Sequence, residues 1–181
     1  MLHSMPMHSR IVTGEWEAYI EANKKFAEAV LEIYSPGDLV WVHDYHLFLL
    51  PKLLREKVPD MSIMFFLHVP FPTAEILKLL PNHVDIIQGL LHCDLIGFHT
   101  PDYATAFAGC VTRIEGLPVT LGRIIIRGPR GGGRVVQLGS FPMGIDFNKY
   151  HDIDTNPDIS SMVKEIIRHF GIEKLVFSVS R

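Results

Sequence analysis

Three short apolar runs in this chain each end on a histidine. The runs and their histidines are 39–42 with His43, 63–67 with His68, and 95–98 with His99. Each run is rich in β-branched or aromatic residues, is too short for a buried helix, and precedes a segment with helical spacing. Alternating strands and helices predict an α/β fold with a parallel sheet, in which ligands bind outside the carboxyl ends of the strands. We therefore expect the three histidines to face one cleft.

Further helices and strands are indicated along the rest of the chain. Apolar spacing predicts helices over 16–34, 47–54, 76–80, 85–91, 101–114 and 159–170. Thr73 and Thr100 stand where a side-chain oxygen can cap a helix, and Pro101 at a first helical position sacrifices no hydrogen bond. Alternation on both sides of the glycine-rich 128–133 predicts a β-hairpin within 119–139. A crossing segment at 141–146 and a last strand at 175–179 complete the expected order.

Composition favours one compact core and argues against several classes of protein. Of 181 residues, 48% are hydrophobic and 20% charged, which is typical of a folded domain. A net charge of −3 without a Lys/Arg cluster argues against a nucleic-acid partner. No apolar stretch reaches the roughly 20 residues of a membrane span, and residues 1–10 lack the apolar middle of a signal peptide. Cys93 and Cys110 are too few for a disulfide framework, so we expect a cytoplasmic protein.

Several candidate sites have an ordinary structural explanation. His43, Asp44 and His46 are metal-ligand types, but a strand directs successive side chains to opposite faces, so we expect no metal site there. A single strand-end histidine more often bonds to a loop. The glycines at 131–133 lack the strand, helix and lysine of a phosphate-binding loop. Trp16 lies on an apolar stripe and fits a core position equally well.

Six motifs follow one another along the chain. They are Trp16-x-x-Tyr19-x-x-x-Asn23-x-x-Phe26-Ala27, Trp41-Val42-His43-Asp44-Tyr45-His46-Leu47, Phe66-Leu67-His68-Val69-Pro70-Phe71-Pro72, Gly89-Leu90-Leu91, Asp94-Leu95-Ile96-Gly97-Phe98-His99-Thr100-x-Asp102-Tyr103 and Phe141-Pro142-Met143-Gly144-Ile145-Asp146. Together, over residues 1–181, the sequence resembles the trehalose-6-phosphate synthase family. That resemblance implies a retaining glycosyltransferase with two Rossmann-like domains, the type B fold. It also implies glucose transfer from UDP-glucose to glucose 6-phosphate without a required metal or other cofactor.

The resemblance assigns roles to five residues. Asp44 and Tyr45 would bind the acceptor sugar, and Trp16 would wall its pocket. His68 would touch the donor glucose near the reacting carbon, so Asp44 and His68 are the expected catalytic residues. Arg181 matches the arginine that opens the family's Arg-Leu-Asp-Tyr-x-Lys-Gly segment, and its bidentate fork suits a donor phosphate.

Two departures from the family pattern predict that the chain is a fragment. The family's amino-terminal glycine loop would precede Met1, and the lysine and most nucleotide-binding residues would follow Arg181. Ser4 stands where many active members carry a tyrosine. We expect 1–146 to be the later part of the acceptor domain with the hinge, and 147–181 to begin the donor domain.

Two other functions stay open. One is a glucosylglycerol-phosphate synthase. His46 favours the trehalose enzyme instead, because glucosylglycerol-phosphate synthases tend to have asparagine at this position. The other is a catalytically silent, synthase-like regulatory subunit, which Ser4 favours and Asp44, His68 and Arg181 oppose. A homo-oligomer of the whole protein and a downstream phosphatase domain are equally open.

Overall fold

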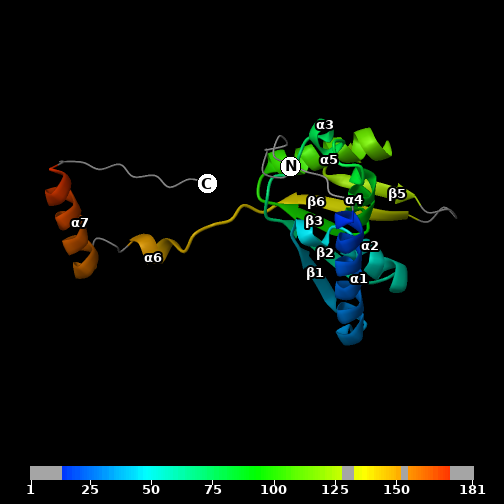
Figure 1. Cartoon of the computed structure of the whole chain (residues 1–181), viewed down its shortest axis with the longest axis horizontal. Helices are drawn as coiled ribbons and strands as arrows, with labels where there is room; N and C mark the ends of the chain where they lie inside the picture. Colours follow the sequence, from blue (N-terminus) through cyan, green and yellow to red (C-terminus); the bar gives the residue numbers. More distant parts are fainter. Residues whose placement is uncertain (1–13, 128–132, 152–154, 172–181) are drawn as a thin grey trace. The chain divides into compact units, whose positions relative to one another are not determined.

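A mixed sheet with the strand order β1-β2-β3-β6-β5-β4 organises the larger part of the molecule (Figure 1). The computed structural model describes residues 14–127, 133–151 and 155–171. The strands are β1 (Leu39–His43), β2 (Ser62–Leu67), β3 (Leu95–Phe98), β4 (Val119–Thr120), β5 (Arg123–Arg127) and β6 (Gly133–Ser140). β1, β2, β3 and β6 run parallel, whereas β5 and β4 are antiparallel to their neighbours. The predicted α/β sheet is confirmed.

The hairpin predicted within 119–139 is also confirmed, and it has a second role. Arg127 pairs with Gly133 at the closed end of β5 and β6. On its other side β6 pairs in parallel with β3, where Leu95 lies opposite Gln137. The hairpin therefore continues the central sheet and adds its antiparallel strands, which a purely parallel sheet would lack.

Helices follow the strands at most of the predicted places. They are α1 (Glu15–Ile33), η2 (Tyr45–Leu47), α2 (Leu50–Lys57), α3 (Ala74–Leu77), α4 (His83–Leu90), α5 (Pro101–Cys110), the π-helical η3 (Val111–Glu115), α6 (Phe147–His151) and α7 (Pro157–Phe170). The expected cap of α5 is present, since Thr100 Oγ1 accepts the Tyr103 amide at 3.4 Å. Thr73 precedes α3 without a side-chain capping bond, and that helix ends at Leu77 rather than at residue 80.

The bounds predicted for the helix after β1 were wrong. Residues 45–47 form a 3₁₀ turn, and α2 begins only at Leu50, with Pro51 in its first turn. Proline is tolerated in a first turn because its missing N–H has no partner there anyway. The helix continues to Lys57, and Val58, which precedes Pro59, is extended.

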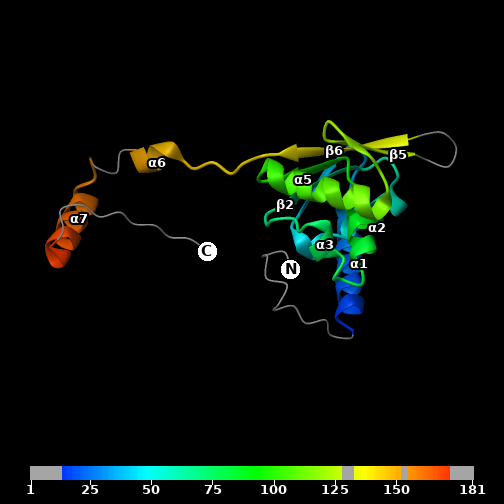
Figure 2. The same ribbon diagram turned by 90° about the horizontal axis from the view of Figure 1, so that it is seen from above.

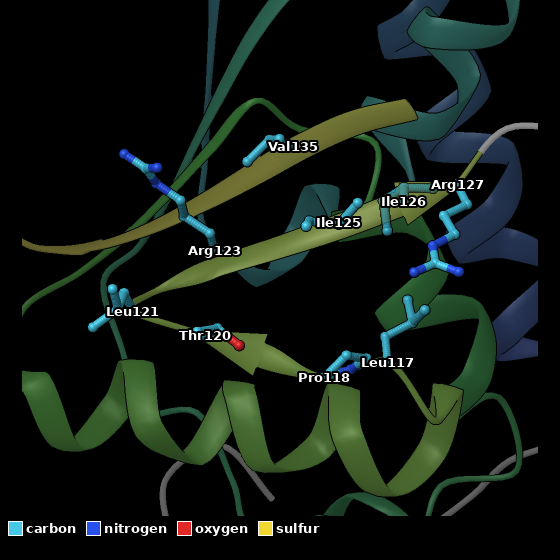
Figure 3. Close-up of a pocket in the computed structure, with 9 residues that line it drawn as sticks. All are labelled: Leu117, Pro118, Thr120, Leu121, Arg123, Ile125, Ile126, Arg127 and Val135. Carbon is cyan, nitrogen blue, oxygen red and sulfur yellow. The ribbon is translucent and has the colours of Figure 1, made fainter. Parts of the chain in front are cut away.

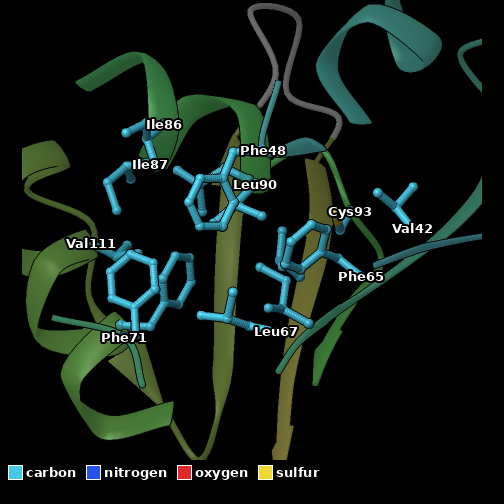
Figure 4. Packing of buried hydrophobic residues seen from close by; sticks show 14 of the residues in the cluster. Val42, Phe48, Phe65, Leu67, Phe71, Ile86, Ile87, Leu90, Cys93 and Val111 are labelled. Carbon is cyan, nitrogen blue, oxygen red and sulfur yellow. The ribbon is translucent and has the colours of Figure 1, made fainter. Parts of the chain in front are cut away.

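One face of the sheet carries the hydrophobic core. Alternate strand residues such as Val42, Phe65 and Leu67 are buried together with side chains from the helices (Figure 4). Figure 2 shows α3 and α5 on the same side of β6. The opposite face holds Trp41 and Ile125, which are 57% and 59% exposed. Strand alternation explains the contrast, because successive side chains point to opposite faces.

A close backbone approach fixes α4 beside the segment that follows β1. A Cβ added to Gly89 would lie 2.2 Å from the carbonyl oxygen of Phe48. Only a residue without a side chain fits this contact. Gly89 thereby helps to set the position of the 44–48 segment at the carboxyl edge of the sheet.

The second compact unit begins at Met143. Residues 141–146 have no regular secondary structure, and the predicted helix over 159–170 is present as α7, which starts two residues earlier. The Asn156 side chain accepts the Asp158 amide at 3.0 Å and caps that helix. The strand predicted at 175–179 lies outside the described residues. No helix within the described ranges is long and apolar enough to cross a membrane.

Candidate functional site at the carboxyl edge of the sheet

The three strand-end histidines lie in a row at one edge of the sheet. His43 is the last residue of β1, while His68 and His99 directly follow β2 and β3. His43 Nδ1 lies 3.0 Å from His68 Nε2. The rings of His68 and His99 are 5.6 Å apart between centroids. Parallel strands with adjacent register bring these side chains together, because their carboxyl ends share one edge.

This row offers hydrogen bonds to a polar ligand. One of the facing nitrogens of His43 and His68 must donate and the other accept, which orients both rings. His99 Nδ1 is buried and has no hydrogen-bond partner in the described part of the chain. Its ring meets Phe66 edge to face at 4.9 Å. Imidazole nitrogens can donate or accept hydrogen bonds, so the row suits a ligand with polar groups.

The suggested metal ligands do not converge. His43 faces His68, whereas His46 stacks on Tyr45 with ring centroids 4.0 Å apart. Among the residues that the structure describes, no group of three His, Cys, Asp or Glu side chains could hold a metal ion.

Asp44 has an unusual backbone conformation immediately after β1. Its φ of 69° and ψ of 168° fall in a region that side-chain-bearing residues rarely adopt. The Asp44 amide donates to the Phe66 carbonyl at 2.8 Å, and Asp44 Oδ1 accepts the His68 amide at 3.4 Å. The carboxylate is thereby held beside the first residue after β2. Such strain persists where the surroundings fix it, and it is common at functional sites.

Tyr45 and Trp16 are linked to this segment through α1. Tyr19 Oη donates to the Tyr45 carbonyl at 2.7 Å, and Trp16 stacks on Tyr19 with centroids 5.3 Å apart. Trp16 also lines a hollow of about 280 Å³ together with Ile20, Leu49, Lys52, Leu53, Glu56 and Asp85. The structure thus brings Asp44, Tyr45 and His68 together. Trp16 is linked to them through Tyr19, on which it stacks. Arg181 and Ser4 lie outside the described residues.

A larger hollow of about 710 Å³ contains none of the predicted site residues. Its lining, drawn in Figure 3, is Leu117, Pro118, Thr120, Leu121, Arg123, Ile125, Ile126, Arg127 and Val135. The walls are mainly aliphatic, and the two arginines supply positive charge. Most of this surface comes from β4, β5 and β6 and the turns beside β4 rather than from the histidine row.

The sequence patterns did not reveal the role of Tyr19 and Asn23. These side chains form hydrogen bonds to the backbone of residues 45–48, which follow Asp44. Both belong to the first of the six motifs, and neither was assigned a role of its own. Asn23 is fully buried. An asparagine on an apolar stripe is a detectable signal, because a buried amide needs hydrogen-bond partners.

Comparisons with known proteins support the family resemblance that the six motifs indicated. The sequence profile of glycosyltransferase family 20 matches residues 1–181. This chain belongs to glycosyltransferase family 20. It is 43% identical over 166 residues to a protein of Dictyostelium discoideum described as alpha,alpha-trehalose-phosphate synthase [UDP-forming] A, covering 92% of the chain and 22% of that relative. With the UDP-forming synthase of Emericella nidulans it shares 40% over 185 residues, covering 100% of the chain and 36% of the relative.

A solved structure of this family matches the fold. The Escherichia coli trehalose-6-phosphate protein bound with UDP-2-fluoro glucose superposes with a TM-score of 0.78 at 26% identity, over 92% of this chain and 37% of that one. The chain therefore has the α/β fold of these synthases. It spans well under half the length of the relatives that it matches.

Proposed function

We propose that this chain supplies the acceptor side of the active site in a UDP-forming trehalose-6-phosphate synthase. The observation that carries the proposal is Asp44, held in a strained conformation beside His68 at the carboxyl edge of the sheet. Residues 1–146 would be the later part of the acceptor domain with its hinge. Residues 147–181 would begin the domain that binds the nucleotide sugar.

The proposed reaction joins two glucose units with retention at the anomeric carbon. The bond between C1 of the donor glucose and the diphosphate of UDP breaks. A bond from C1 to the 1-hydroxyl oxygen of glucose 6-phosphate forms on the same face of the sugar. The hydroxyl proton passes to the departing diphosphate oxygen, so the products are UDP and trehalose 6-phosphate.

Each site residue then has a defined task. Asp44 and Tyr45 hold acceptor hydroxyls, and Trp16 walls the acceptor pocket. His68 contacts the donor glucose where positive charge develops, which lowers the barrier more than it strengthens ground-state binding. Arg181 is assigned to the donor phosphate because its planar fork pairs two oxygens at once. No metal is assigned to the reaction.

A cytoplasmic setting is part of the same proposal. Cys93 and Cys110 are free and buried. Burial raises the pKa of Cys110 to about 11 and that of Cys93 as well, so both stay protonated thiols. Thiols of this kind fit a reducing compartment. Phosphorylated and nucleotide-activated sugars are the proposed partners, and neither nucleic acid nor a membrane is assigned.

The test is turnover by the protein at its full natural length, with UDP-glucose and glucose 6-phosphate as substrates. Asp44→Ala should lower kcat/KM for the acceptor by roughly 100-fold or more, because unpaired hydroxyls and misaligned attack both raise the barrier. Asp38→Ala is the matched control, since Asp38 lies at the opposite end of β1 and bonds only locally to the Ser35 amide in the described contacts. A loss below about threefold for Asp44→Ala would remove it from the site.

Two further measurements separate the alternatives. His68→Ala should lower kcat more than it raises the KM for UDP-glucose. Turnover with glycerol 3-phosphate in place of glucose 6-phosphate would identify the glucosylglycerol-phosphate activity instead. Binding of glucose 6-phosphate without any UDP release would identify a silent regulatory subunit. Loss of activity on chelation, restored by stoichiometric zinc, would contradict the metal-free assignment.

A further inference from the structure

Helix α1 binds the backbone of the segment that carries Asp44 and Tyr45. Tyr19 Oη donates to the Tyr45 carbonyl at 2.7 Å and accepts the Phe48 amide at 3.0 Å. The Asn23 amide nitrogen donates to the His46 carbonyl at 3.1 Å. Three backbone groups within four residues are thus bonded to two side chains on one helix.

The two side chains also support each other. They are four residues apart and therefore lie on the same face of α1. Asn23 Nδ2 donates a second hydrogen bond to the Tyr19 carbonyl at 2.9 Å. Because that nitrogen lies between two carbonyl oxygens, the orientation of the amide group is fixed. Burial raises the pKa of Tyr19 to about 12, so its hydroxyl keeps the proton that it donates to Tyr45.

Asp44 is held from the opposite side as well. Its amide donates to the Phe66 carbonyl of β2 at 2.8 Å, and its carbonyl accepts the Leu47 amide at 3.2 Å. With α1 on one side and β2 on the other, the backbone at Asp44 keeps a φ of 69° that it would otherwise leave. The backbone that carries the carboxylate is thus held from both sides, in addition to the bond between Asp44 Oδ1 and the His68 amide.

We propose that Tyr19 and Asn23 are positioning residues that hold Asp44 and Tyr45 in the geometry that binds the acceptor. This inference rests on the proposed function for its kinetic consequence. Neither side chain needs to contact substrate. Their effect is selective, since the clamped segment is assigned to the acceptor and the donor phosphate is assigned to Arg181.

The experiment compares Tyr19→Phe with the unaltered protein at its full natural length. Phenylalanine keeps the packing against Trp16 and removes both hydrogen bonds of the hydroxyl. The KM for glucose 6-phosphate should rise about tenfold, while the KM for UDP-glucose stays within about twofold. Tyr34→Phe is the matched control at the other end of α1, and it should leave both constants unchanged. An equal rise in both KM values would overturn the proposal, because it would indicate general loosening.

A second readout does not depend on catalysis. Amide hydrogen exchange should become about tenfold faster in the 44–48 segment of Tyr19→Phe and stay unchanged in α5. Asn23→Asp should speed exchange in the same segment, because it replaces the donating amide nitrogen by an oxygen that repels two carbonyls. If the unaltered protein makes no trehalose 6-phosphate, the proposed function fails, while faster exchange still supports the clamp. Unchanged exchange in both variants would overturn the clamp whatever the activity.

Discussion

The polar groups at the two ends of the central strands differ in whether their hydrogen-bonding capacity is already used. At the carboxyl edge, His68 is exposed, His99 Nδ1 lacks a partner in the described chain, and Asp44 has a strained backbone. At the amino edge, Arg55 pairs with Asp94, and Arg134 donates to the backbone carbonyls just before Asp94. The same strands thus end in groups that are available to a ligand and begin in groups that are already satisfied. Buried polar groups with full partners stabilise a fold, whereas unmatched ones are typical of functional sites.

Arg55 is the centre of the amino-edge cluster. It pairs with both carboxylate oxygens of Asp94 at 2.9 Å and donates to the carbonyls of Pro59, Met61 and His92. Asp94 Oδ2 also accepts the Ile63 amide at 2.8 Å. The cluster therefore ties α2, the start of β2 and the end of α4 together.

The largest effect is expected from Arg55→Met, which should lower the free energy of unfolding by about 3 kcal/mol. It leaves Asp94 and several carbonyls without their donor. Urea unfolding measures the change. Arg113→Met is the control, because the Arg113–Glu75 pair is exposed by 60% and 65% and should contribute far less to the free energy of unfolding than Arg55 does. Equal losses for the two arginines would remove the contrast between the cluster and an ordinary surface pair.

Arg134→Met should lower the free energy of unfolding by about 1–2 kcal/mol. Arg134 donates to the carbonyls of Leu91 and Cys93 after α4. Burial, and then the charge of Arg55, lowers the pKa of Arg134, so repulsion offsets part of its contribution. The same urea titration tests it, with exposed Arg123→Met as the control on the neighbouring strand. A loss larger than that of Arg55→Met would show that Arg55 is not the centre of the cluster.

At the carboxyl edge, a substitution should increase the free energy of unfolding instead of lowering it. Asp44→Gly should raise the free energy of unfolding by about 1 kcal/mol, since relief of backbone strain exceeds the entropy that glycine loses on folding. In the protein at its full natural length, the same variant should also lose the proposed synthase activity. Thermal melting and turnover on one preparation test both halves. A destabilised Asp44→Gly would mean that the contact between Oδ1 and the His68 amide outweighs the strain.

The smallest expected effect is a pH dependence at the amino edge. Burial lowers the pKa of His92 from 6.5, and its Nδ1 bonds the Gln88 carbonyl at 2.7 Å. Below pH 6.5 the unfolded chain binds a proton that native His92 resists, so the free energy of unfolding falls as the pH falls. His92→Gln should flatten that slope between pH 8 and pH 5 in urea titrations. An unchanged slope would assign the acid sensitivity to other groups.

Local signals in the sequence were enough to locate most elements. The apolar runs before His43, His68 and His99 gave the three parallel strands, because a short β-branched run has few alternatives. Thr100 and Pro101 gave the start of α5, since capping depends only on adjacent residues. The helix after β1 was misplaced because a 3₁₀ turn, held by α1 through Tyr19, precedes the α2 start near Pro51. That hold is a contact between residues far apart in the sequence.

Local patterns along the chain were enough to show that three histidines stand at the ends of three strands and that Asp44 follows the first of them. Hydrophobic periodicity and chain order suffice for both, because they act between neighbours. The pairing of β6 with β3, the bond from Asn23 to the His46 carbonyl and the bond from Arg55 to Asp94 became visible only in the folded structure. These contacts join residues far apart in the sequence, 23 positions for Asn23–His46 and 39 for Arg55–Asp94. Such pairings depend on how the elements pack, and no local pattern along the chain specifies them.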